Sequence, residues 1–89
     1  MTPCEKRYGL LVGLAWELQR LGVGSYVVIP ARGEALLQIC CADGFRLSVL
    51  VAQWDGHWLF IWSPSGHIAA DHIDLAAREI AAAVHHRVA

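Results

Sequence analysis

The chain has 89 residues, of which 56% are hydrophobic and 17% are charged, and its formal net charge at pH 7 is −1. A chain of this length supports one small domain, so we expect residues 1–89 to fold as a single domain. The balanced charge disfavours binding to nucleic acid or to an anionic membrane surface, and no segment reaches the roughly 18–20 apolar residues of a membrane span.

The chain has three cysteines, Cys4, Cys40 and Cys41, whose positions indicate whether the protein lies in a reducing or an oxidising compartment. Cys40 and Cys41 are neighbours on a predicted strand and point to opposite faces, so they cannot share one disulfide framework or one metal ion. We expect both to be buried, inert thiols, which fits a reducing compartment. The N-terminus lacks the basic start and long apolar stretch of a signal peptide, so the sequence predicts a cytoplasmic protein.

The first predicted helix runs from Pro3 to about Leu21. Thr2 is a suitable N-cap with Glu5 completing a capping box, and Gly22 suits the position that follows the helix. Helical spacing places apolar residues along one stripe, namely Tyr8, Leu11, Val12, Ala15 and Leu18.

Four strands follow in the prediction. Residues 25–29 form the first, ended by Pro30. The pairs Asp43-Gly44 and Asp55-Gly56 then separate three apolar runs, which indicates two hairpins with two-residue type I′ turns. The first turn would place Gln38 opposite Val49, and the second would place Trp54 opposite His57.

The second predicted helix begins near Asp71 and ends near His85, after a lead-in over residues 67–70. Asp71 is a suitable N-cap, and Asp74 in the first turn favours the helix dipole. The chain is therefore predicted to be an α+β protein of order α-β-β-β-β-α, with a four-stranded antiparallel meander and two helices mainly on one face.

Both faces of the predicted sheet are apolar, and two short helices have area enough to cover one of them. We expect the helices to cover the aliphatic face, which carries Leu37, Ile39, Leu50, Leu59 and Ile61, although the reverse assignment also leaves one surplus face. The aromatic face is then the candidate interface or ligand-facing surface, made of Gln38, Phe45, Leu47, Val49, Trp58, Phe60 and Trp62.

The other residues that could form a metal or catalytic site have less specific spacing. His67, Asp71, His72 and Asp74 lie close together in the sequence and have the side chains of a zinc site or an acid–base pair. Their spacing matches no standard zinc pattern, and the two aspartates suit a helix start instead. The sequence has no phosphate loop and no nucleophile elbow, so we assign no catalytic residue, no metal ligand and no cofactor.

The last third of the chain carries a resemblance. Residues 58–62 (WLFIW), then Asp71 and Asp74, then residues 76–81 (AAREIA), resemble the tail of short uncharacterised actinobacterial proteins, in which a Trp-rich strand precedes a polar turn and an Ala-rich helix. The resemblance implies a strand, turn and helix in this order and implies no activity.

These observations predict a small non-catalytic accessory or regulatory module for protein interaction, which forms a homodimer through the aromatic sheet face. Another protein or an apolar small molecule is the alternative partner. The alternative function is a small-ligand-binding protein or a small enzyme, such as a biosynthetic accessory enzyme. Its pocket would form at the aromatic face, lined by Gln38, Trp58, Trp62 and either His57 or His67.

Overall fold

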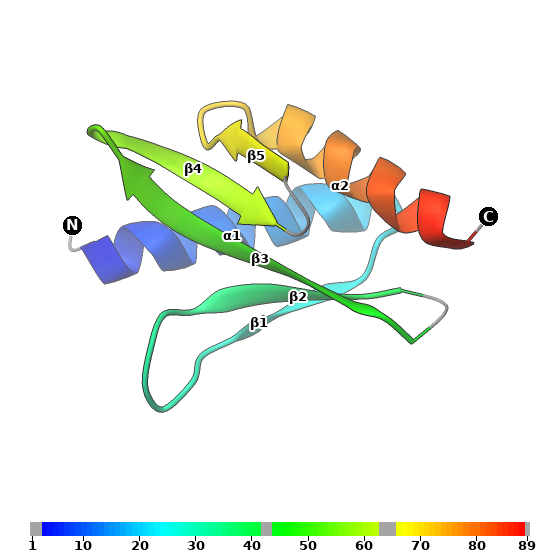
Figure 1. Cartoon of the computed structure of the whole chain (residues 1–89), viewed down its shortest axis with the longest axis horizontal. Coiled ribbons are helices and arrows are strands. Elements are labelled where there is room, and N and C mark those ends of the chain that lie inside the picture. The colour runs from blue at the N-terminus through cyan, green and yellow to red at the C-terminus, as the bar shows by residue number, and fades with distance from the viewer. Residues whose placement is uncertain (1–2, 42–43, 63–65, 89) are drawn as a thin grey trace.

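The computed structural model describes residues 3–41, 44–62 and 66–88. An antiparallel sheet of five strands in the order β1-β2-β3-β4-β5 lies against two helices; in Figure 1, α1 passes behind the strands and α2 lies beside β5. The fold is therefore α+β, as the sequence predicts. The elements in chain order are α1 (Pro3–Arg20), β1 (Ser25–Val28), β2 (Leu36–Cys40), β3 (Arg46–Trp54), β4 (His57–Trp62), β5 (Gly66–Ala69) and α2 (Ile73–Val88).

The prediction of four strands is wrong, because the segment expected to lead into the second helix is a fifth strand. Residues 66–69 pair antiparallel with β4, and Ile68 lies opposite Phe60. Four residues are too few to show an alternating pattern, and one of them is a glycine, a residue that is depleted in strands. The additional strand extends the meander to the element that contacts α2.

The end of α1 is as predicted. Gly22 has a φ of +79°, the left-handed conformation that glycine adopts without steric cost. The backbone N–H of Val23 donates to the carbonyl of Leu18, and the N–H of Gly22 donates to the carbonyl of Gln19. This pair of bonds is the Schellman motif, which satisfies carbonyls that the helix end leaves open. The predicted N-cap, Thr2, lies outside the described residues.

The start of α2 differs from the prediction. The carbonyl of His72 accepts the first helical bond, from the N–H of Ala76 at 2.9 Å, so His72 rather than Asp71 is the N-cap residue. Asp74 does lie in the first turn. The backbone N–H of Leu75 and then the guanidinium of Arg78 hold the pKa of the Asp74 carboxyl below its ordinary value.

The structure confirms the second predicted hairpin and shows that the predicted register of the first is wrong. At the second, Trp54 lies opposite His57 and both turn residues have positive φ, 51° at Asp55 and 79° at Gly56, which confirms the type I′ turn. At the first, Gln38 lies opposite Ser48 rather than Val49. The loop is one residue longer than predicted, because the N–H of Cys41 donates to the carbonyl of Phe45 across residues 42–44.

This shift of one residue moves every β2 side chain to the other face of the sheet relative to the prediction. Leu37 and Ile39 consequently share a face with Val49, Val51 and Phe60. All five are essentially inaccessible and form the core together with Leu11, Leu14 and Leu18 of α1 and Ala76, Ala77 and Ile80 of α2. We call this helix-covered side the covered face.

The predicted choice of face is therefore wrong for β3 and β4, since the helices cover their aromatic side. Phe60 is fully buried and Trp62 is 8% exposed, whereas their neighbour Ile61 is 37% exposed. On β4 the physical reason is area, because Phe60 and Trp62 remove more apolar surface from water than Ile61 between them. The expected surplus face does exist, on the opposite side.

Candidate functional site: the open face of the sheet

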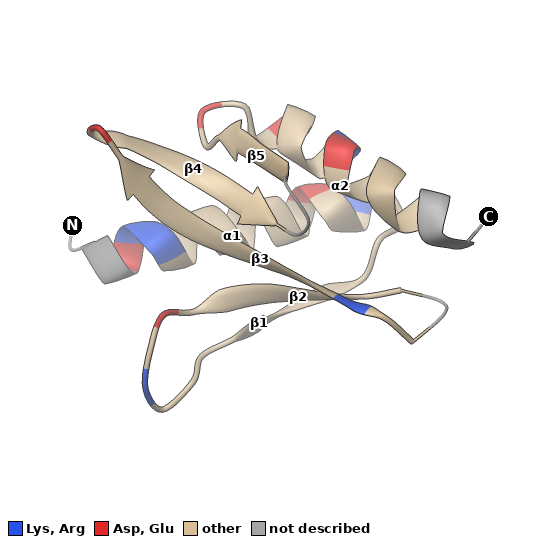
Figure 2. Cartoon of the chain, in the orientation of Figure 1, with Lys and Arg blue, Asp and Glu red and all other residues tan. Residues whose placement is uncertain are grey.

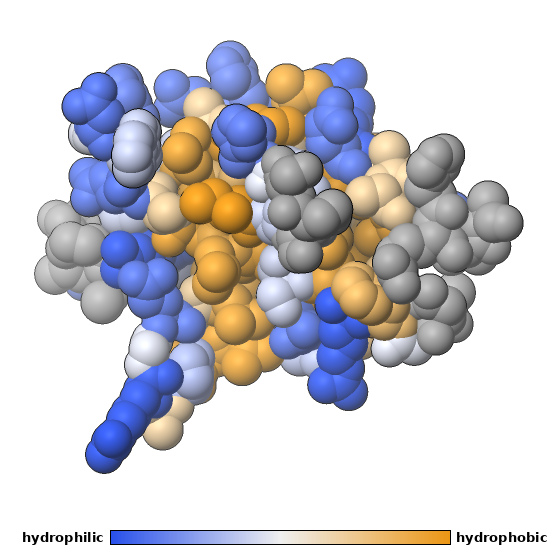
Figure 3. Space-filling model, viewed as in Figure 1, coloured by the Kyte–Doolittle hydropathy of each residue, from blue (hydrophilic) through white to orange (hydrophobic). Residues whose placement is uncertain are grey.

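The face of the sheet turned away from the helices is apolar and exposed. Leu50 at the centre of β3 is 41% exposed, Tyr26 on β1 is 45% exposed, and Trp54 near the β3–β4 turn is 74% exposed. Orange residues form a band across the central strands on this side in Figure 3. We call this surface the open face; its apolar members are Tyr26, Val28, Leu36, Leu50, Ala52, Trp54, Leu59, Ile61 and Ala69.

The polar side chains of the open face are few, and two of them satisfy each other. Gln38 and Ser48 are cross-strand partners, and the Gln38 amide nitrogen donates to the Ser48 hydroxyl at 3.1 Å in a half-buried position. Arg46 lies at the first position of β3, opposite Cys40. The strands in Figure 2 are almost entirely without charge. The centre of the open face therefore carries no formal charge.

The structure separates the residues predicted to form the aromatic interface. Leu47, Val49, Phe60 and Trp62 are buried in the core, and Trp58 is half-buried on the same covered face. Gln38 lies on the open face, and Phe45, 40% exposed, lies beside the β2–β3 turn. The covered residues are not available to a partner of the folded chain, so the prediction of an aromatic docking face is corrected to an open face that is mainly aliphatic.

The alternative pocket at the aromatic face does not form either. Trp58 and Trp62 lie on the covered face, whereas Gln38, His57 and His67 lie on the open face. The sheet stands between these two groups, because side chains of opposite parity project to opposite sides.

The two strand cysteines and the cluster of histidines and aspartates are the other residues that the sequence singled out. Cys41 is buried as expected, but Cys40 is exposed on the open face, so the prediction of a buried thiol is wrong there. His67 on β5, Asp71 and His72 in the following loop, and Asp74 on α2 are all exposed. Among the residues that the structure describes, no three His, Cys, Asp or Glu side chains gather as a metal site.

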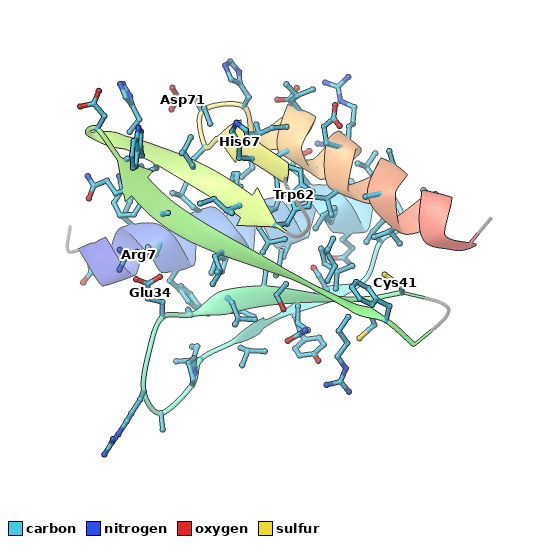
Figure 4. All side chains as sticks on the ribbon, in the orientation of Figure 1. Arg7, Glu34, Cys41, Trp62, His67 and Asp71 are labelled. Atoms are coloured by element: carbon cyan, nitrogen blue, oxygen red, sulfur yellow. The ribbon has the colours of Figure 1, made fainter. Side chains whose placement is uncertain are left out.

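A second candidate surface was missed in the sequence: a groove between α1 and the segment that connects β1 to β2. Pro30 follows β1, and Gly33 has a φ of +97°, a conformation that side chains rarely adopt. The chain then returns toward α1, so that Glu34 and Arg7 point toward each other in Figure 4. The groove has a volume of about 460 Å³ and is lined by Glu5, Arg7, Tyr8, Gly9, Ile29, Gly33, Glu34 and Ala35.

Arg7 is the residue that organises one wall of this groove. Its guanidinium lies 3.5 Å from a carboxylate oxygen of Glu34, and its Cζ lies 5.6 Å from the ring centroid of Trp58. The Arg7 Nε is buried and has no hydrogen-bond acceptor among the described residues. The arginine is therefore held between an aromatic ring and a carboxylate that is half exposed to solvent.

Comparison with known proteins places the chain in no family: no family model, curated protein or solved structure matches it. The resemblance of residues 58–81 to actinobacterial proteins stays a prediction. Neither helix, over its described residues, has the length and apolar character that crossing a bilayer requires.

Proposed function

We propose that this chain is a small non-catalytic interaction module, accessory or regulatory in role, that self-associates through the open face of its sheet. The observation that carries the proposal is the exposed apolar centre of a sheet whose other side forms the core with the helices. Contiguous apolar surface of this kind is uncommon on soluble monomers and is typical of association sites.

A second copy suits this surface because of its charge pattern. A two-fold interface brings the same patch of each copy together, so a central charge would repel its own copy. The central positions, Leu36, Leu50 and Ile61, carry no charge. Arg46 lies at the end of its strand, and His67, opposite Ile61, lies on the edge strand β5. Because the Gln38 amide donates to the Ser48 hydroxyl, one donor and one acceptor of this pair stay bonded when water is removed, which lowers the cost of burying them.

The area of the face limits the size of the interface that two copies can form. Five strands of four to nine residues, about 4.8 Å apart with a rise of about 3.3 Å per residue, give a face of roughly 400–450 Å². Two such faces packed about 10 Å apart form a sandwich of roughly 800–900 Å² in total, just below the roughly 1,000 Å² at which specific interfaces start, as in weak and transient contacts. We therefore expect a dissociation constant in the micromolar range.

The test places a charge at the centre of the open face. Leu50→Lys brings two lysines together across the two-fold axis and should weaken self-association at least about tenfold, measured by sedimentation equilibrium. Val12→Lys is the matched control, because Val12 on α1 is 43% exposed, close to the 41% of Leu50, and lies away from the sheet face. Its association should match the parent protein within about twofold.

A further variant separates lost association from lost folding. Leu50→Thr keeps a residue that favours strands and removes apolar area, so it should weaken association by a smaller factor while the circular dichroism spectrum stays native. A parent protein that stays monomeric at several hundred micromolar contradicts the proposal. Equal weakening by Leu50→Lys and Val12→Lys also contradicts it.

A further inference from the structure

We propose that the groove between α1 and residues 29–35 binds a neutral apolar small molecule, such as a medium-chain alcohol or ester, a function separate from association through the open face. The volume of about 460 Å³ lies within the roughly 300–1,000 Å³ of pockets that hold small molecules. Two segments far apart in the sequence form the groove, and the positive φ of Gly33 sets the turn of its outer wall. The groove is therefore a product of the tertiary fold.

The walls of the groove carry apolar side chains that the chain itself leaves in water. Ile29 is 69% exposed, the highest value of any large aliphatic side chain among the described residues, and Tyr8 on the α1 side is 47% exposed. Gly9 and Gly33 add no side chain, which keeps the space between these walls open. Covering Ile29 and Tyr8 with an apolar body removes their surface from water, and this burial is the driving force for binding.

The charged groups that line the groove are already engaged within the protein. The Arg7 guanidinium lies 3.5 Å from a carboxylate oxygen of Glu34, and its Cζ lies 5.6 Å from the ring centroid of Trp58. Glu5, the other acid of the lining, has an interaction partner of its own. The described lining therefore has no net charge left with which to select a charged head group.

A charged head group would lose water in the groove without gaining an unengaged partner. A carboxylate ligand would compete with Glu34 for Arg7, and an ammonium ligand would compete with Arg7 for Glu34. Either ligand would give up part of its hydration shell and disturb an ion pair whose arginine side chain is only 25% exposed. A neutral ligand loses no hydration of a charge and leaves the Arg7–Glu34 pair intact.

The first experiment compares three probes of equal chain length, 1-octanol, octylamine and octanoate, by amide NMR titration of the full chain. We expect 1-octanol to bind at least about fivefold more tightly than either charged probe, with the largest shifts at the amides of Tyr8, Gly9 and Gly33. Equal or tighter binding of a charged probe overturns the proposal. Shifts confined to the open face, or the absence of saturable shifts with 1-octanol, overturn it as well.

A charge variant shows whether the Arg7–Glu34 pair causes this preference, because the probes also differ in their affinity for water. Glu34→Gln removes the partner of Arg7 and leaves its positive charge at the groove. Octanoate should then bind about threefold to tenfold more tightly, while 1-octanol binding should change by less than about twofold. Glu17→Gln is the matched control, because Glu17 also lies 3.3 Å from an arginine on α1 but does not line the groove. Octanoate binding that is the same in the parent and in Glu34→Gln overturns the role given to the pair.

A steric variant tests the place of binding. Gly9 has open space where a Cβ would lie, so Gly9→Leu fills part of the groove and should weaken 1-octanol binding at least about tenfold. Its thermal midpoint should not fall, because leucine favours a helix more than glycine does. Gly24→Leu is the matched control, since Gly24 also has open space around it and does not line the groove.

Unchanged 1-octanol binding in a folded Gly9→Leu variant overturns the proposed site. Leu50→Lys should bind 1-octanol as the parent does, because Leu50 lies on the open face and not in the groove. Failure of the groove and failure of self-association are thereby told apart.

Discussion

The carboxylate of Asp74 links the start of α2 to the pH dependence of stability. The backbone N–H of Leu75 lowers the pKa of this carboxyl from its ordinary value of 3.8, and Arg78, whose Nη2 donates to it at 2.9 Å, lowers it further. A pKa that is lower in the folded than in the unfolded chain gives stability that is present above the unfolded value. That stability is lost as the pH falls through the folded-state pKa.

We therefore expect Asp74→Asn to lower the urea midpoint at pH 7 and to have a smaller effect at acidic pH, below the folded-state pKa of this carboxyl, where the parent is protonated as well. Chemical denaturation followed by circular dichroism at both pH values measures the difference. Glu79→Gln, an exposed carboxyl farther along α2, is the control. A deficit of Asp74→Asn that is the same at both pH values contradicts the assignment.

At the scale of the element, β4 shows which face of the sheet the helices stabilise. Phe60 is fully buried and its neighbour Ile61 is 37% exposed. Phe60→Ala should reduce the free energy of unfolding by about 3–5 kcal/mol, because it removes a ring from a packed core. Ile61→Ala should cost about 1 kcal/mol or less in the monomer. Denaturation at a protein concentration below the dissociation constant makes the comparison, and a larger loss for Ile61→Ala would reverse the faces.

Local signals in the sequence were enough to predict most elements. The left-handed residue at Gly22 and the Asp55-Gly56 turn are encoded by residues that few other conformations suit, and both are found where predicted. The register of the first hairpin was not predictable in the same way. Because both faces of β2 and β3 are apolar, a shift of one residue leaves the hydrophobic pattern equally good, and the loop length alone decides.

The register of the first hairpin decides which side chains of β2 are exposed. The residues of the open face could therefore not be predicted from the sequence. The side chains of β2 lie on the faces opposite to those predicted, and the helices cover the side of β3 and β4 that we expected to be exposed. Most residues of the predicted interface are therefore part of the core. The groove beside Arg7 joins residues 5–9 to residues 29–35, and neither segment alone has a pattern that indicates a pocket. Pro30 predicted the end of the first strand, but nothing in the sequence predicted that the segment after it approaches α1.

At the scale of the whole molecule, association through the open face couples stability to concentration. If two copies bury their open faces on folding, mass action raises the unfolding temperature with protein concentration. For a chain of 89 residues we expect a rise of about 3–6 °C for each tenfold increase above the dissociation constant. Scanning calorimetry over two decades of concentration measures it, and Leu50→Lys should flatten the dependence. A midpoint independent of concentration in the parent protein argues against a dimer.

The order of the strands in the sheet is also their order along the chain. Each strand can pair with its predecessor as soon as one short loop closes, so the sheet pays little entropy for distant encounters and its low contact order favours fast folding. The contact of α1 with α2 joins the two ends of the sequence, with Gly13 close to Ile73. Docking of the helices therefore carries the largest loop-closure cost, and we expect it to complete folding after the hairpins have formed.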